Sequence, residues 1–262
     1  MPTITKNCYQ LESITIDAKL GMKPVLDKFF QKRGKNLKSL TIHGSGVWYQ
    51  TPDPWDEEED IFEYISQCEN LEDLYLNNLG KQIPRILYFP ERLKRLHVNE
   101  SHGSREEFLD IFDFNMNRSN ITEIFLKNLS TSSIQDAVLI GRIANLDFPA
   151  LERFYIRSKT VGEDEQYDNE NINESTINTM LENSPNIKSI QIYGQSNRRF
   201  NSVISTEFME DLCINRGIYV DFRFGNLDQT WLENYLKKQG PDVRKKYLKM
   251  KSDLPKFRSE YE

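Results

Sequence analysis

The chain has 262 residues, of which 38% are hydrophobic and 28% charged, and its formal net charge is -6. This composition is typical of a soluble folded protein and excludes a disordered chain, and no run of about 18 apolar residues that could span a membrane is present. The negative charge argues against nucleic-acid binding by the molecule as a whole. The three cysteines form no CxxC pair and the N-terminus lacks a secretory pattern, so we expect the cytoplasm or the nucleus, without membrane association.

A hexad with apolar residues at its first, fourth and sixth positions recurs along the chain. Its copies contain Leu11-Ile14-Ile16, Leu37-Leu40-Ile42, Leu71-Leu74-Leu76, Leu93-Leu96-Val98, Ile121-Ile124-Leu126, Leu151-Phe154-Ile156 and Ile187-Ile190-Ile192. A weaker eighth copy has Gly217 in the first position, followed by Val220 and Phe222. Chance could produce one or two such hexads but not this series, so the chain is predicted to be a repeat protein.

The segments between the hexads predict helices. In chain order these are a helix from Pro24, one within 57–67, one from Ser104 over 104–114, one within 130–143, one from a Ser175 cap to about Pro185, and one within 205–217. Gly217 is expected to be a left-handed C-cap of the last one. Strands that alternate with helices favour a parallel sheet with helices on its outer side. Each unit needs its neighbours to bury its apolar faces, so the units should stack.

The hexads resemble leucine-rich repeats of the ribonuclease-inhibitor-like kind. The final LCINRGIYVDFRF (212–224) is similar to the last repeat of F-box leucine-rich-repeat proteins, although no segment resembles the F-box itself. The resemblance implies an α/β fold, a curved solenoid (horseshoe) with a parallel concave sheet of about eight strands and outer helices, over residues 1–224. It also implies a substrate-recognition role related to SCF ubiquitin ligases, and the short stretch before the first hexad would fit the loss of an upstream F-box. Residues 225–262 would form a C-terminal helical cap and a basic tail.

One feature of that family is missing. Its repeats usually carry Asn or Cys eight residues after the first leucine, where the side chain bonds the neighbouring loop. The corresponding residues here are Lys19, Ser45, Leu79, Ser101, Leu129, Lys159 and Gln195. We therefore expect the loops to satisfy their backbone groups individually, without a regular ladder.

Strand alternation sends the third, fifth and seventh positions of each copy to the concave face. The fifth positions are Thr15, Thr41, Tyr75, His97, Phe125, Tyr155, Gln191 and Asp221, so four consecutive copies should expose a ring. The predicted partner-binding residues are Tyr75, Arg95, His97, Phe125, Arg153, Tyr155, Arg157 and Tyr193. Aromatic residues and arginine are enriched in protein-binding hot spots. The alternative is that the rings only stabilise their cross-strand neighbours.

Charged segments lie outside the hexads. Two acidic insertions, at 51–60 and 162–174, are either solvated loops or attract a basic segment of a partner. The segment 237–258 contains nine Lys or Arg residues and two Asp residues. It could bind nucleic acid or an acidic membrane, or fold back onto the acidic insertions, but no aromatic platform accompanies it. Before it, Trp231, Leu232, Tyr235 and Leu236 form a stripe that should cap the last repeat, and Pro241 suits the first position of another helix.

The sequence contains no recognisable catalytic or metal-binding motif. Cys8 and Cys68 occupy the same slot before their hexads and Cys213 lies in a predicted helix, so all three are expected in the core. His43, His97 and His102 have no neighbour at metal-ligand or nucleophile–base spacing. We predict a non-enzymatic scaffold, with no cofactor and no metal, that binds a protein partner on the concave sheet. The alternatives are a nucleic-acid-associated adaptor that uses the basic tail and, less favoured, an enzyme whose site is assembled from distant loops.

Overall fold

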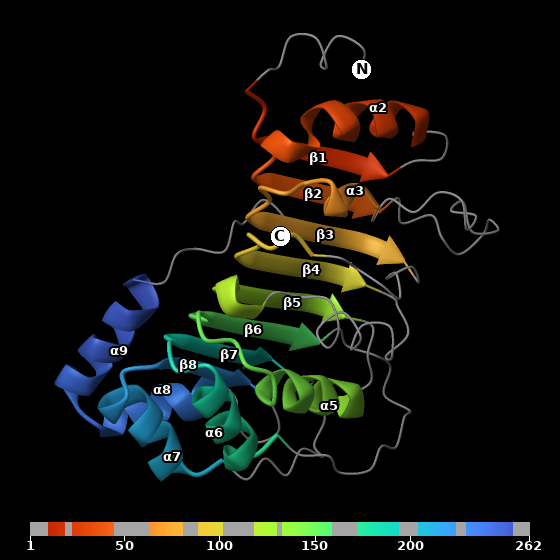
Figure 1. The fold of residues 1–262 in the computed structure, drawn as a ribbon. Helices are drawn as coiled ribbons and strands as arrows, with labels where there is room; N and C mark the ends of the chain where they lie inside the picture. The colour runs from red at the N-terminus through yellow and green to blue at the C-terminus, as the bar shows by residue number, and fades with distance from the viewer. Residues whose placement is uncertain are drawn as a thin grey trace.

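A computed structural model of the protein describes residues 10–18, 23–44, 63–80, 89–101, 118–129, 133–158, 172–193, 204–223 and 229–253. Its centre is a single sheet of eight strands, all parallel, in which the spatial order of the strands equals their order in the sequence (Figure 1). The strands are β1 (Ser13–Ala18), β2 (Ser39–Gly44), β3 (Asp73–Gly80), β4 (Arg95–Ser101), β5 (Glu123–Leu129), β6 (Arg153–Ser158), β7 (Ser189–Tyr193) and β8 (Tyr219–Arg223). Each strand begins at the third position of one predicted hexad, so the eight predicted strands are confirmed.

The sheet register aligns equivalent positions of every hexad. Leu40 pairs with Leu74 and Leu74 with Leu96, and the same fourth position is paired at every later step to Val220. The alignment shifts only after the hexads, near Asn77 and Lys127. A parallel register that keeps one position opposite itself places the fourth and sixth positions of all the strands on one face.

That face carries the hydrophobic core. From β2 onward, the fourth and sixth positions of the strands are all buried, in one cluster that also contains helix residues such as Leu26, Ile140 and Met180. In β1, Ile16 is buried and Ile14 packs against the cluster as a half-buried residue. The first positions from Leu37 to Ile187 are buried as well. In the eighth unit Gly217 is exposed, and the next residue, Ile218, is buried in its place. The predicted inward orientation of the hexads is therefore confirmed.

The same turn precedes six of the strands. The backbone N–H of the first apolar residue donates to the carbonyl three residues earlier, for example Leu71 to Cys68 at 2.9 Å and Leu151 to Phe148 at 3.0 Å. The carbonyl of the second hexad residue then accepts two N–H groups of the next unit, as Glu72 does from Lys94 and Arg95. This pattern recurs from unit to unit, so the backbone of the turns is satisfied in a regular way.

Asparagine side chains reinforce these turns. Asn70, Asn120 and Asn186 each stand immediately before the first apolar residue of their unit, and each donates to a carbonyl in the turn of the preceding unit. The distances to the carbonyls of Lys35, Glu91 and Pro149 are 2.6, 2.8 and 2.7 Å. These contacts link successive turns ahead of the strands, at the opposite end from the loops for which no regular ladder is predicted. The loops that follow the strands lie largely outside the described residues.

The helices cover the apolar face of the sheet, where their buried residues join the strand core. They are α2 (Lys23–Arg33), α3 (Glu63–Ser66), α5 (Ser133–Ala144), α6 (Glu174–Asn183), α7 (Thr206–Glu210), α8 (Gln229–Lys238) and α9 (Pro241–Asp253). Those predicted from Pro24 and within 130–143 are confirmed as α2 and α5, and α3 is a single turn of the helix predicted within 57–67. The helix predicted at 104–114 lies outside the described residues. Among the described helices, none has the length and apolar character that crossing a bilayer requires.

The ends of two helices differ in part from the prediction. The N-cap of α6 is Asn173, whose side chain accepts from the Thr176 backbone N–H at 2.9 Å, so the predicted Ser175 cap is wrong. Asn173 directly precedes the first helical residue, so its side chain can accept from an N–H that the helix leaves unpaired, whereas Ser175 already lies in the first turn. The helix within 205–217 continues from α7 as a π-helical turn, Asp211–Asn215. Gly217 follows with φ +68°, which confirms the predicted left-handed residue.

The two C-terminal helices close the sheet at β8 (Figure 1). Tyr235 and Leu236 of α8 are buried in the common core, which is the capping role that the sequence predicts for them. Helix α9 begins at Pro241, as predicted. Its Tyr247 packs on Tyr219 with ring centroids 5.0 Å apart and donates a hydrogen bond to the Val220 carbonyl at 2.9 Å. A side chain of α9 therefore satisfies a backbone group of the last strand.

We expect Leu74→Ala to destabilise the protein strongly. Leu74 is fully buried on a central strand, so truncation leaves a cavity and should lower the free energy of unfolding by about 2–5 kcal/mol. The matched control is Leu248→Ala on α9, where 50% of the residue is exposed and the change should be within about 0.5 kcal/mol. Urea unfolding followed by circular dichroism measures both. Equal losses in the two variants would contradict the assigned core.

Candidate functional site

The face of the sheet opposite the core carries the third, fifth and seventh positions of the hexads, and we call it the ladder face. Adjacent strands place equivalent positions side by side, so each position forms a row across the sheet. The third-position row is mainly charged in the centre, the fifth is aromatic, and the seventh is polar and basic. All eight predicted partner-binding residues belong to these rows on β3 to β7.

The aromatic row is a continuous line of ring contacts, with an edge-to-face contact at Tyr75–His97 and stacked contacts in the centre. Ring centroids are 4.5 Å apart between Tyr75 and His97, 5.1 Å between His97 and Phe125, and 4.3 Å between Phe125 and Tyr155. The Phe125 and Tyr155 planes are nearly parallel, at 12°. Tyr193, from the seventh position of β7, extends the row with a centroid 5.3 Å from that of Tyr155. The structure thus brings five of the predicted residues together in one line.

The rings are less accessible than the sequence suggests. Tyr75 and Tyr155 retain only 6% and 9% exposure, whereas His97 and Phe125 are half-buried. The expectation that four consecutive units each expose a ring is therefore wrong for the two tyrosines. Rings on adjacent strands stand close enough to cover one another, and this ring-on-ring packing removes part of each from solvent.

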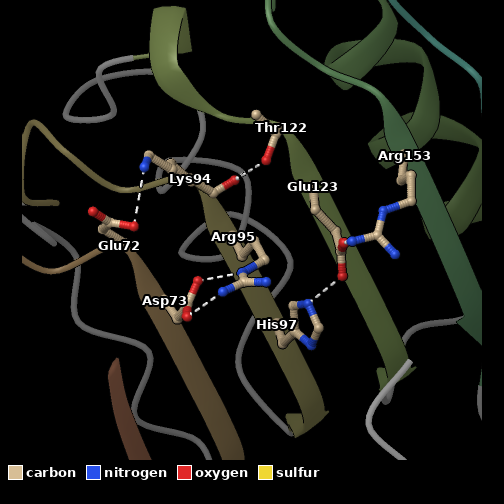
Figure 2. A network of polar contacts seen from close by, with 8 residues as sticks. All are labelled: Glu72, Asp73, Lys94, Arg95, His97, Thr122, Glu123 and Arg153. Carbon is tan, nitrogen blue, oxygen red and sulfur yellow. Dashed lines mark hydrogen bonds and ion pairs between the residues drawn. The ribbon is translucent and has the colours of Figure 1, made fainter. Parts of the chain in front are cut away.

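Arg95 is held by the neighbouring strand (Figure 2). Its guanidinium makes a two-point contact with Asp73, with Nη2 donating to Oδ2 at 2.5 Å and Nε donating to Oδ1. The hydrogen bond to Asp73 raises the pKa of Arg95 above its usual value. A bidentate arginine–carboxylate pair fixes both side chains, so Arg95 enters any complex with its counter-ion already in place.

Glu123 is the buried centre of a second charge cluster. Its side chain is 3% exposed and lies between His97, whose Nε2 is 2.5 Å from Oε1, and Arg153, which forms an ion pair with Oε2 (Figure 2). Burial, and then repulsion by Arg95, lower the pKa of Arg153. Along the third-position row the charges of Asp73, Arg95, Glu123 and Arg153 alternate, so each arginine has a carboxylate on an adjacent strand.

Three carboxylates of this face are absent from the predicted partner-binding residues, although the sequence places one of them, Asp221, at a fifth position. Asp73 and Glu123 occupy third positions, and Asp221 occupies the fifth position of β8, where it is buried and accepts from the Tyr193 hydroxyl at 2.7 Å. The available signal was the alternation of sign at equivalent hexad positions, which predicts cross-strand pairing. The predicted set contains aromatic residues and arginines, the types that are enriched in binding hot spots. It therefore leaves out the carboxylates that pair with those arginines.

Arg157 differs from the other two predicted arginines. It lies in the seventh-position row of β6, is exposed, and is paired in register with Lys127 of β5. The third-position arginines are engaged within the sheet, whereas Arg157 is on the other side of the aromatic row. The structure therefore separates the three predicted arginines into two different environments.

Both cysteines that the structure describes are buried. Burial raises the pKa of the Cys68 thiol to about 12 and that of Cys213 to about 11, which keeps both protonated and poorly nucleophilic. Within the described parts of the chain, no three His, Cys, Asp or Glu side chains are grouped as a metal site. His43 and His97 lie on the ladder face as predicted, while His102 and Cys8 are outside the described residues.

No model of a known protein family matches this chain, and no curated protein matches it either.

We expect Glu123→Gln to destabilise the fold. The substitution removes the buried negative charge between His97 and Arg153 and leaves the largely buried Arg153 without its counter-ion, at a cost of about 3 kcal/mol. The control is Glu152→Gln, since Glu152 pairs with Lys188 at 2.7 Å on an exposed site worth less than about 1 kcal/mol. Chemical denaturation of both variants measures the difference. A loss no larger than that of the control would mean that the cluster around Glu123 contributes nothing specific.

Proposed function

We propose that the protein is a non-enzymatic interaction scaffold that binds a protein partner on the ladder face. The observation that carries this proposal is the unbroken row of contacting rings from Tyr75 to Tyr193, across five adjacent strands and outside the hydrophobic core cluster. Aromatic side chains bury much surface at a small entropic cost, so such a row is suited to contact another protein.

The geometry of the row supports binding in a second way. The rings pack against one another and the adjacent arginines are ion-paired, so the side chains lose little freedom when a partner arrives. Preorganised surfaces lose less free energy to side-chain ordering on association than mobile ones. His97 and Phe125, the half-buried members at the centre, are the anchors that a partner would cover. The alternative is that the row only stabilises the sheet, since each aromatic pair contributes about 0.5–1.5 kcal/mol to folding stability. Binding experiments separate this explanation from a role in partner binding.

The proposal includes the architecture of a leucine-rich-repeat solenoid with a concave sheet. It is supported by units that follow one another in sequence order, by the turn that recurs before the strands, and by the asparagines that link successive turns. The link to SCF ubiquitin ligases rests on the resemblance of residues 212–224 to the last repeat of F-box proteins. A pull-down with the Skp adaptor and a cullin tests that link, and a negative result removes it without affecting the scaffold proposal. A reducing compartment, cytoplasm or nucleus, is part of the same proposal.

We expect Phe125→Ala and Tyr155→Ala to weaken capture of the cellular partner. Truncating a buried interface aromatic costs about 2 kcal/mol or more, which corresponds to roughly thirtyfold in affinity. Affinity purification with quantitative mass spectrometry identifies proteins that the original chain retains and both variants lose. The control is Val25→Ala, at an exposed residue of α2 away from the ladder face, and it should retain them. Unchanged capture by the two ring variants, with folding confirmed by circular dichroism, would place the contact surface elsewhere.

A second candidate function is that of a nucleic-acid-associated adaptor that binds the phosphate backbone. The basic surface of α8 and α9 favours it. The exposed cations of these helices are Lys237, Lys238, Arg244, Lys245, Lys246, Lys249 and Lys251. The other side of α9 is anchored by Tyr247, so the helix holds a basic surface outward. A cluster of this kind attracts phosphates even in a chain of net negative charge.

A salt titration tests this second candidate. If it is correct, labelled single- and double-stranded DNA bind at low salt, and affinity falls steeply as salt is raised because phosphate contacts release counter-ions. Lys245→Glu with Lys249→Glu should reduce the binding and its salt dependence, whereas Lys28→Glu with Lys32→Glu on α2 is the matched control with the same charge change. Absence of binding at low salt, or equal loss in both double variants, would reject it.

A further inference from the structure

The seventh-position row of the ladder face contains hydrogen-bond donors from β2 to β7. In register these residues are His43, Asn77, Asn99, Lys127, Arg157 and Tyr193. None of the six is a carboxylate. The row runs beside the aromatic row, two residues further along each strand, so an occupant of the rings would also meet these donors.

Charge on the ladder face is balanced in one row and unbalanced in the other. Arg95 and Arg153 are matched by Asp73 and Glu123. Lys127 and Arg157, in contrast, make no ion pair with any residue that the structure describes, and they stand directly opposite each other on β5 and β6. Two like charges in cross-strand register repel each other and destabilise the sheet. This arrangement is unfavourable for the protein alone and becomes favourable with an anion between the two side chains.

Asn77 adds an unsatisfied donor to the same row. The residue is 8% exposed, and its Nδ2 has no hydrogen-bond partner among the described residues. A buried amide without a partner costs about 1–3 kcal/mol, so an acceptor is the missing component. Asn77 lies two strands from Lys127 in this row, with Asn99 between them.

We propose that the segment of the partner that binds the ladder face is an extended acidic peptide, with aspartate or glutamate side chains at Lys127 and Arg157 and an acceptor at Asn77. This inference rests on the proposed function and names the chemistry of the partner. An extended strand suits the face because its side chains alternate, so that one set reaches the rings and another reaches the cations. A nucleic acid fits poorly, since Asp73 and Glu123 line the opposite side of the rings and would repel the phosphates.

Fluorescence anisotropy with labelled synthetic peptides tests the inference on the full chain. The probe is a short peptide of alternating glutamate and leucine, and the comparison peptides carry glutamine or lysine in place of glutamate. We expect the glutamate peptide to bind at least about tenfold more tightly than the glutamine peptide, a difference of about 1.4 kcal/mol, and the lysine peptide not to bind. Equal binding of the glutamate and glutamine peptides, or no binding of the glutamate peptide, would overturn the proposal, as would tighter binding of a single-stranded DNA of similar length to this face.

Variants assign the binding to the row. Lys127→Gln and Arg157→Gln should each weaken the glutamate peptide about tenfold, whereas Lys94→Gln and Lys188→Gln, at exposed lysines paired with Glu72 and Glu152, should leave it unchanged. Without peptide, Arg157→Gln should slightly raise the melting temperature, because it removes the repulsion by Lys127. If the cellular partner is lost in Phe125→Ala but fully retained in Arg157→Gln, the scaffold function stands and the acidic-peptide inference fails. If neither variant affects the partner while the glutamate peptide still requires Arg157, the inference about this row stands and the proposed partner site fails.

Discussion

The fold depends on the burial of apolar side chains, which no single repeat unit can achieve alone. Each strand has apolar residues at the fourth and sixth hexad positions, and these residues pack with helix residues such as Phe30, Ile140 and Met180 in one continuous cluster. Burying a large apolar side chain contributes about 1.5–3 kcal/mol, and this gain is realised only when the neighbouring unit is in register. The parallel pairing of equivalent residues, repeated from β1 to β8, follows from that requirement. The core sets the order in which the units stack. The stack is further stabilised by the asparagines before the hexads, by the recurring turns and by the α9 helix that covers its end.

The opposite face of the same sheet is organised by polar and aromatic contacts between strands. The ring row and the alternating charges from Asp73 to Arg153 are two ways of stabilising neighbours that are about 4.8 Å apart. In each of these two rows the side chains find their partners within the chain. Every ring from His97 to Tyr155 has a ring on each side, and Arg95 and Arg153 each pair with a carboxylate. The seventh-position row breaks this rule at Lys127, Arg157 and Asn77. This difference between rows of the same face supports a ligand-binding role more strongly than the aromatic residues do by themselves.

The two ends of the sheet also differ. At β8, Tyr247 of α9 covers Tyr219 and bonds the Val220 carbonyl, which ties the last strand into the core and limits further strand addition at that edge. At β1, Ile14 stays half-buried and Thr15 is exposed, so the first unit is less deeply packed in the described part of the chain. The basic outer surface of α9 is a consequence of the capping role, because Val243, Tyr247 and Met250 pack inward and leave the cations outside.

The amino-acid sequence alone determined the eight strands, their common orientation and most helix positions, because hydrophobic periodicity is a local property. Residues two positions apart, such as the fourth and sixth of each hexad, already specify which face of a strand is buried. It placed Tyr75, His97, Phe125 and Tyr155 in one row for the same reason. Only the tertiary structure decided how those residues are used. Glu123 meets both His97 and Arg153, and Arg95 meets Asp73, across more than twenty residues of chain. Such contacts exist only after the strands align, so side-chain pairing, the burial of Tyr75 and Tyr155, and the unmatched charges of Lys127 and Arg157 are properties of the assembled sheet.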